Sequence, residues 1–257
     1  MKIVKIGCCG FPVSRKKYFK EYSVVELQNT FYNLPSKEWA EKIRSEAPES
    51  FEFTLKAWQV ITHPHKSPTW KKLKTKPPGD PENYGWLKPT KENLEALRKT
   101  LEIANILGSK IIVLQTPPSL PCNNDSFEWI NKFFEEAKSI TEDKYVLGWE
   151  PRGEWAKKKD LLEKILVKNN VLHIVDPYRA DPLNIVDDII YYRLHGIGRG
   201  EVNYKYKYTD EDHEKLVKKL LSLEYRTAYV MYNNIYMYQD SKKLKEILSN
   251  KPGIQTL

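Results

Sequence analysis

Short runs of aliphatic and aromatic residues alternate along the whole chain with helical patterns. Eight such runs predict strands over residues 3–8, 24–29, 51–57, 110–115, 145–150, 171–175, 189–195 and 227–232. Between the runs, apolar residues recur at helical spacing. Strands that alternate with helices lie parallel and are joined by right-handed crossovers. Eight such units, in the roughly 250 residues usual for the fold, predict an α/β chain with a (β/α)₈ barrel.

The ends of the helices carry recognisable signals. Four polar residues are expected to begin helices: Thr90, Asp125, Thr209 and Asp240. Gly108 is expected to end the first of these, and Glu128 to complete a capping pair with Asp125. Further helices are expected near 36–46 and 158–168. The turn-rich stretch 176–188 lacks a helical pattern, which predicts a slightly irregular barrel. An open doubly wound sheet is the structural alternative, although no GxGxxG motif follows the first strand.

One connection is too long for an ordinary loop. Residues 57–89, between the third strand and its helix, exceed the usual length of structureless loops, which is below about 15 residues. The stretch holds several aromatic residues, among them Trp58, Trp70 and Trp86, which argues against disorder. We expect a single domain over 1–257, with this segment ordered over the mouth of the barrel. A surface excursion packed on a helix is the alternative.

Composition limits the classes of protein that the chain can belong to. No run of 18 apolar residues is present, so no membrane span is expected, and a cytoplasmic location is the default expectation. The three cysteines have no metal-binding spacing and are expected to be small buried residues, with a reactive thiol as the alternative. The net charge of +8 is scattered along the chain. A surface like that of thermophilic proteins explains this charge as well as a nucleic-acid partner does.

Polar and ionisable residues stand at the carboxyl ends of seven predicted strands. In barrels of this kind the chemistry takes place at that end. Three of these residues are predicted to be catalytic: Lys56, Glu150 and His195. Others at or just beyond the strand ends are predicted to bind substrate: Glu26, Asn29, Tyr32, His63, Gln115, Arg152, Asp176, Arg193, Asn233 and Asn234.

The proposed roles follow from the chemistry of each side chain. Glu150 and His195 can transfer protons, and Arg193 can hold a carboxylate or a phosphate through two hydrogen bonds. Lys56, at the end of an apolar strand, has three alternatives: a structural pair with Glu150, an electrostatic contact with substrate, or a Schiff base. The loop after the seventh strand is predicted to bind an anion through Gly196, Gly198 and Arg199, with a tight turn as the alternative.

These residues predict an enzyme without metal or cofactor that acts on a small anionic or polyhydroxylated substrate, for example one with phosphate or sugar groups. Hydrolase, lyase and isomerase remain open, and the sequence does not indicate an oligomeric state. One alternative is a metal-dependent phosphoesterase or sugar isomerase with four ligands: Glu26, Glu150, Asp176 and His195. A second is a nucleic-acid-binding or nucleic-acid-processing protein, because YKYKY at 204–208 interleaves bases with aromatic rings.

Six motifs stand out along the chain: VVELQNTFYNLPS (24–36), FEFTLKAWQVITHP (51–64), LGSKIIVLQTPPS (107–119), Glu150-Pro151-Arg152 followed by Trp155, YYRLHG (191–196) and YVMYNN (229–234). As a set, these motifs resemble the YecE-like family, known as domain of unknown function 72. They occur in family order over nearly the whole chain. The resemblance implies a TIM barrel and no established reaction. The chain departs from the family after the first strand, where CCGFPVSRKKYF is short and basic.

Overall fold

The computed structural model describes residues 1–249 and 251–257. The chain folds as a closed (β/α)₈ barrel of parallel strands, in the sheet order β2-β3-β4-β5-β6-β7-β8-β1. Strand β1 (Lys2–Cys9) pairs with β8 (Thr227–Tyr232) and also with β2 (Val24–Leu27), which closes the sheet. A ninth strand, β9 (Ile254–Thr256), adds to the free part of β1. The predicted fold class is therefore confirmed.

The chain divides into two compact units, each described by itself. The first comprises residues 1–26, 47–52 and 173–257, and the second 27–46 and 53–172. The first unit contains β1, α1 (Arg15–Glu21), β7 (Ile189–Leu194), α9 (Asp210–Ser222), β8, α10 (Met237–Ser249) and β9. Most of β2 and of β6 (Leu172–Val175) also belongs to it.

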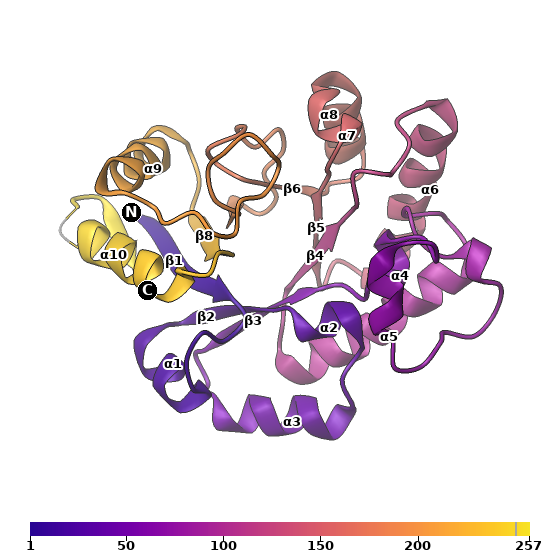
Figure 1. Ribbon diagram of the computed structural model, residues 1–257, viewed down its shortest axis with the longest axis horizontal. Helices are drawn as coiled ribbons and strands as arrows, with labels where there is room; N and C mark the ends of the chain where they lie inside the picture. Colours follow the sequence, from indigo (N-terminus) through magenta and orange to yellow (C-terminus); the bar gives the residue numbers. More distant parts are fainter. Residues whose placement is uncertain (250) are drawn as a thin grey trace. The chain divides into compact units, whose positions relative to one another are not determined.

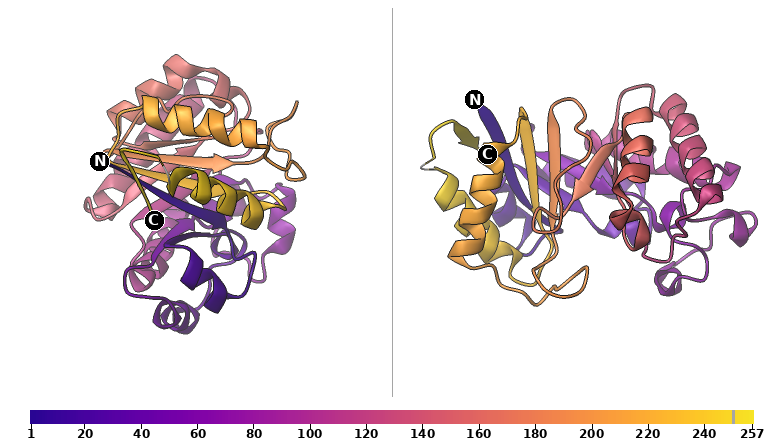
Figure 2. Two further views of the ribbon diagram at one scale, coloured as in Figure 1. Left: turned by 90° about the vertical axis from the view of Figure 1, so that its left-hand side faces the viewer. Right: turned by 90° about the horizontal axis from the view of Figure 1, so that it is seen from above.

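The core of the first unit lies between its strands and helices. Helix α10 packs on β1 and β8 and contacts α9 (Figure 1). Buried residues that alternate along β7, such as Ile190, Tyr192 and Leu194, join Leu216 of α9 in this core. Arg193 and His195 therefore point to the opposite side of the strand, as the two-residue spacing predicts. Figure 2 shows the two termini side by side, where β9 pairs with β1.

The second unit contains the remaining strands and their helices. These are α2 (Asn29–Tyr32), α3 (Lys37–Glu46), β3 (Glu52–Lys56, which begins at the boundary), α4 (Gln59–Thr62), the 3₁₀ turns η1 (Pro68–Lys72) and η2 (Pro81–Asn83), α5 (Lys91–Leu107), β4 (Ile111–Gln115), α6 (Asn124–Thr141), β5 (Val146–Glu150), α7 (Glu154–Lys157) and α8 (Lys159–Lys168). Helix α5 contacts α3 and α6, and α6 contacts α8.

Most predicted helix ends are confirmed, and two are wrong. Thr90 caps α5, which ends at Gly108, and Thr209 caps α9. Helix α6 begins earlier than predicted, because Asn123 and Ser126 form the capping box in place of Asp125 and Glu128. Helix α10 begins at Met237, so Asp240 lies within its first turn. The Asp240 carboxylate accepts hydrogen bonds from the Tyr208 backbone and from Asn234 instead of capping.

The segment between β3 and α5 is ordered and folds back on itself. Backbone hydrogen bonds join Gly85 to Val60, Trp86 to Thr62 and Leu87 to Ile61. Asn93 of α5 holds the segment by hydrogen bonds to both backbone groups of Gly85. Its predicted place over the mouth of the barrel stays a prediction.

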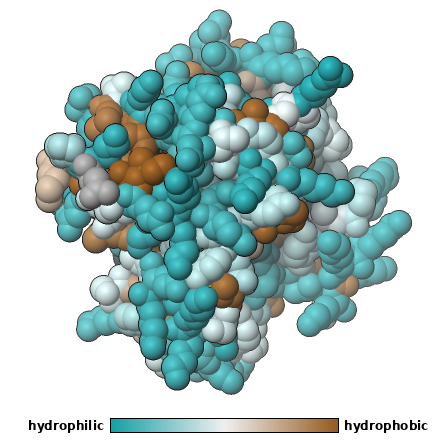
Figure 3. Space-filling view, turned by 60° about the vertical axis from the view of Figure 1, so that its left-hand side comes forward, coloured by the Kyte–Doolittle hydropathy of each residue, from teal (hydrophilic) through white to brown (hydrophobic). Residues whose placement is uncertain are grey.

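The helices, the surface and the cysteines agree with what the composition predicts. Within residues 1–249 and 251–257, no helix combines the length and hydropathy needed to cross a membrane. The face drawn in Figure 3 is mostly hydrophilic, with small hydrophobic patches between the charged side chains. Cys8 and Cys9 are buried, and burial raises the pKa of Cys8 to about 12 and that of Cys9 well above its ordinary value. Both therefore behave as small core residues.

Candidate functional site

Lys56, Gln115 and Glu150 end three neighbouring strands of the second unit. The register places Gln115 of β4 opposite Glu150 of β5, and Lys56 of β3 opposite Val113 of β4. All three site residues are buried, and the Lys56 Nζ donates a hydrogen bond to Gln115 Oε1 at 2.8 Å. Strand pairing therefore fixes a charged amine, an amide and a carboxylate at one edge of the sheet.

Phe31 forms an apolar side of this site. The Lys56 ammonium lies over its ring, 4.0 Å from the centroid, which is a close cation–π contact. Helix α2, which carries Phe31, is joined to β3 because Thr30 Oγ1 donates to the Lys56 carbonyl at 2.7 Å. Tyr32 packs edge to face on Phe31 at 5.0 Å. Asn29, predicted at a strand end, instead begins this helix and is exposed.

Glu150 has an arginine partner two residues further along the chain. Arg152 donates from Nε and from Nη2 to Glu150 Oε1, at 3.3 and 2.9 Å. Both side chains are largely buried, so the attraction is screened less than between surface charges. The arginine therefore compensates the negative charge of the carboxylate and fixes its orientation.

His63 lies against the same phenylalanine and is held from several sides. Its ring packs edge to face on Phe31 with centroids 5.0 Å apart, and Thr62 Oγ1 lies 2.8 Å from its Nδ1. The Trp70 indole donates to its carbonyl. Burial, with the charges of Lys56 and Arg152, lowers the pKa of His63 to about 3. The imidazole is therefore neutral at any pH in which the protein would work.

Glu26 and Arg193 form a buried ion pair in the first unit. Arg193 donates from Nε to Oε2 at 3.0 Å and from Nη2 to Oε1 at 2.8 Å, a bidentate geometry. Neither side chain is exposed. Tyr191 also donates to Glu26 Oε2, at 2.9 Å, and Cys9 lies 3.5 Å from Oε1. This arrangement satisfies the charge of Arg193 within the protein and is typical of a structural pair.

His195 and Asp176 meet at the ends of β7 and β6. The His195 backbone N–H donates to Asp176 Oδ2 at 3.1 Å. Asn233 Nδ2 lies 3.1 Å from His195 Nδ1, so the amide donates to Nδ1 and the ring proton resides on Nε2. Tyr204, 44% exposed, packs edge to face on the imidazole at 6.1 Å. Asn234 lies apart from this pair and donates to Asp240 and to the Tyr206 carbonyl.

The glycine-rich loop after β7 is closed by its own hydrogen bonds. Gly196, with φ of +82°, donates its N–H to the Tyr208 hydroxyl, and its carbonyl accepts from Arg179. A Cβ at Gly196 would lie 2.1 Å from the Asn203 carbonyl oxygen, so only glycine fits this turn. Gly198 and Arg199 are exposed. The anion site at this loop stays a prediction, and the Gly196 N–H already has an acceptor.

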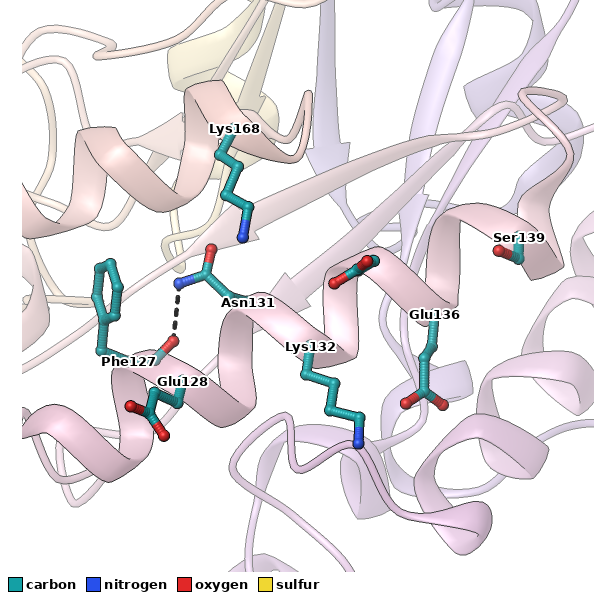
Figure 4. Close-up of a pocket in the computed structure, with 8 residues that line it drawn as sticks. Phe127, Glu128, Asn131, Lys132, Glu136, Ser139 and Lys168 are labelled. Atoms are coloured by element: carbon teal, nitrogen blue, oxygen red, sulfur yellow. Dashed lines mark hydrogen bonds between the residues drawn. The ribbon is translucent and has the colours of Figure 1, made fainter.

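The cavity in Figure 4 lies away from the strand ends. It has a volume of about 550 Å³ and is lined by residues of α6 and by Lys168 of α8. Lys168 points towards Asn131, whose side chain donates to the Phe127 carbonyl. None of the predicted site residues lines it. Its mixed charges, from Glu128, Lys132 and others, give it no selective chemistry.

Sequence reasoning missed some residues that shape these clusters. Tyr191 stands two residues before Arg193 on the same face of β7, so alternation could have identified it. Phe31 and Thr62 lie on four-residue helices, α2 and α4, for which no periodic signal exists. In the described part of the chain, no three His, Cys, Asp or Glu side chains come together in a way that could hold a metal ion.

Comparison with known proteins places the chain among proteins of the same architecture. The family model for "Protein of unknown function DUF72" matches residues 14–255. A DUF72 family protein from Enterococcus faecalis superposes with a TM-score of 0.70 at 15% identity, over 98% of this chain and 99% of that one. Another from Thermotoga maritima gives 0.69 at 22% identity, over 96% and 100%. Endonuclease IV from Thermus thermophilus gives 0.58 at 11% identity, over 96% and 100%. No curated protein matches the sequence.

Proposed function

The chain belongs to the DUF72 family, and from that premise we propose that it is an enzyme for a small anionic or polyhydroxylated substrate. The substrate would bind at the ends of β3, β4 and β5. Glu150 would transfer a proton to or from the reacting group, and Lys56 and Arg152 would hold negative charge. Gln115 and Tyr32 would contact the substrate through their polar groups.

The balance of charge at these strand ends carries the proposal. Lys56 and Arg152 are two cations beside one carboxylate, Glu150, and His63 adds no charge because it is neutral. Both cations carry several N–H donors, which can also bind an anionic group of a substrate. This supports a substrate with a phosphate or a carboxylate, and it disfavours a divalent cation as its companion.

Glu150 is the best placed proton-transfer group of the cluster. It is buried, its carboxylate is oriented through Arg152, and β5 holds its backbone rigidly. A positioned acid or base contributes about 10²- to 10⁴-fold to the rate of proton transfer. Lys56 would act electrostatically, since its amine already donates to Gln115 and lies on Phe31. His195 stays a predicted second acid–base group of the first unit.

The test is a substrate screen with matched variants. Sugar phosphates, hydroxy acids and free sugars are incubated with wild-type protein, and any turnover is then measured in Glu150→Gln and Lys56→Met. We expect kcat/KM to fall by about 100-fold or more in each. Glu154→Gln and Lys157→Met, which alter an exposed pair on α7, are the controls and should behave like wild type. Equal turnover by Glu150→Gln and Lys56→Met would exclude this site.

A second candidate function is binding of single-stranded nucleic acid, supported by one surface of the first unit. Tyr204 exposes its ring, and Lys205 and Lys207 beside it are also exposed. Lys207 lies 5.8 Å from the ring centre of Tyr236. Exposed rings next to lysines allow bases to stack while phosphates are neutralised. The related fold of endonuclease IV agrees with this candidate at the level of architecture.

Binding of a labelled single-stranded oligonucleotide tests this candidate. Fluorescence polarisation should detect binding at low salt, with an affinity that falls steeply as salt rises. Tyr204→Ala and Lys205→Glu should weaken it several-fold, whereas Lys157→Glu, on the other unit, should change it little. Absence of binding in low salt removes the candidate.

A further inference from the structure

We propose that His63 is a fixed neutral hydrogen-bond donor which, together with Lys56 and Arg152, binds an oxyanion of the substrate. The inference rests on the site of the proposed function and adds to it the class of group that is recognised. It assigns His63 to the binding of a phosphate, sulfate or carboxylate group and not to proton transfer.

The position of the imidazole is fixed before any ligand binds. Its backbone N–H donates to Gln59 at 2.7 Å, and its carbonyl accepts from the Trp70 indole at 2.8 Å. Gly85 packs so tightly on this backbone that a Cβ there would lie 2.6 Å from the His63 carbonyl carbon. The side chain of His63 is 6% exposed. Such a preorganised donor loses little entropy on binding.

The hydrogen bond at Nδ1 determines which nitrogen carries the proton. Thr62 Oγ1 lies 2.8 Å from Nδ1 and 3.5 Å from the Gln59 carbonyl, so the imidazole is the better acceptor for its hydroxyl proton. With Nδ1 accepting, the ring proton resides on Nε2. Among the described residues, Nε2 has no hydrogen-bond partner. This N–H is therefore able to donate to a group that binds beside it.

The groups around His63 select an anion as that acceptor. Lys56 from β3 lies on the same Phe31 ring as the imidazole, at 4.0 Å, and Arg152 follows β5 with its carboxylate partner Glu150. On the side of α2 and η1, Lys72 lies 4.5 Å from the Tyr32 ring. Glu150 is the acidic residue of this set, and Arg152 binds it. An oxyanion would therefore meet two cations and one neutral donor.

Sulfate is the probe for this site, because its charge does not change between pH 5 and pH 8. Calorimetry at constant ionic strength should show sulfate binding to the full-length protein, with an affinity that changes less than about threefold over this range. His63→Leu should weaken it roughly tenfold, the loss of one donor to a charged group. His63→Gln, which keeps an N–H donor, should restore part of it. His65→Leu is the matched control and should bind like wild type.

Nuclear magnetic resonance of the imidazole nitrogens gives a second readout. In wild-type protein, His63 should show the neutral form with its proton on Nε2, from pH 5 to pH 8, with and without sulfate. Acetate and malonate, tested in parallel, show whether carboxylates bind as well as tetrahedral anions. Unchanged sulfate affinity in His63→Leu would overturn the inference, and so would affinity that rises tenfold per pH unit as pH falls, the mark of an imidazolium.

The outcomes separate the inference from the proposed function. Glu150→Gln should still bind sulfate while losing turnover. If wild-type protein binds none of these anions at 50 mM or less, the inference fails, whereas the role of Glu150 is decided by the substrate screen alone. If sulfate binds and Glu150→Gln turns over substrate normally, the oxyanion site stands and the proposed function fails.

Discussion

At the scale of single residues, the charged side chains at the strand ends, which were predicted to contact substrate, bind other side chains of the protein. Arg193, predicted to hold substrate, is occupied by Glu26 in a bidentate pair with no exposure. Glu150 is held by Arg152, and Lys56 donates to Gln115. The buried pair of Arg193 and Glu26 leaves neither charge uncompensated inside the protein, so it is typical of a structural role.

The buried ion pair of Arg193 and Glu26 leads to a prediction about stability. Arg193→Met and Glu26→Leu should each lower the free energy of unfolding by about 3–5 kcal/mol, since each leaves an uncompensated buried charge. The double variant should be less destabilised than the sum of the two, because it leaves no charge behind. Urea unfolding followed by circular dichroism measures all three. Additive losses would mean that the two side chains do not act as a pair. The exposed pair Glu154 and Lys157 serves as a control in which no change is expected.

At the scale of elements, the sequence predicted the strands better than their surroundings. Eight strands lie within two residues of their predicted ends, because buried parallel strands read as continuous apolar runs. Helices of four residues, such as α2, α4 and α7, escaped prediction because an amphipathic repeat needs at least two turns. The strand-end residues of the candidate site were predictable for the same reason as the strands. Their partners were not, since these depend on strand register and on the reach of long side chains.

A prediction about stability follows from the packing of Gly85 in the segment between β3 and α5. Gly85 has φ of +85°, and a Cβ there would lie 2.5 Å from the Pro64 backbone nitrogen. Gly85→Ala should destabilise the protein by about 2 kcal/mol or more, and it should weaken sulfate binding because His63 is displaced. Gly79→Ala, also at positive φ but close only to the Glu92 side chain, should cost less and leave sulfate binding intact. Thermal melts and calorimetry compare them. Equal effects of the two substitutions would argue against tight packing at Gly85.

At the scale of the whole molecule, buried neutral histidines link stability to pH. The pKa of His63 is about 3, and burial also lowers that of His213, whereas an unfolded histidine titrates near 6.5. Below pH 6.5 the unfolded chain therefore binds protons that the folded chain does not. The free energy of unfolding thus decreases as the pH is lowered. His63 alone should remove roughly 2–3 kcal/mol between pH 6.5 and pH 4.5.

Urea unfolding at pH 7 and at pH 4.5 tests this linkage. The difference between the two pH values should shrink by about 2 kcal/mol in His63→Gln relative to wild type, since glutamine does not titrate. His65→Gln should leave the difference as it is, because His65 is only half-buried. A wild-type slope that persists in His63→Gln would assign the acid sensitivity to other groups.

The short strand β9 has a consequence for how the protein behaves when it is cut or tagged. Its three residues pair with Lys2, Ile3 and Val4, and Leu257 exchanges backbone hydrogen bonds with β1. Without residues 251–257, this part of β1 would present unsatisfied N–H and C=O groups along an apolar strand, which is a template for another chain to join. A protein shortened at residue 250 should therefore self-associate, as light scattering would reveal, while its absorbance spectrum and helix content stay those of the native chain. Strand β9 should therefore protect the edge of β1 from pairing with other chains.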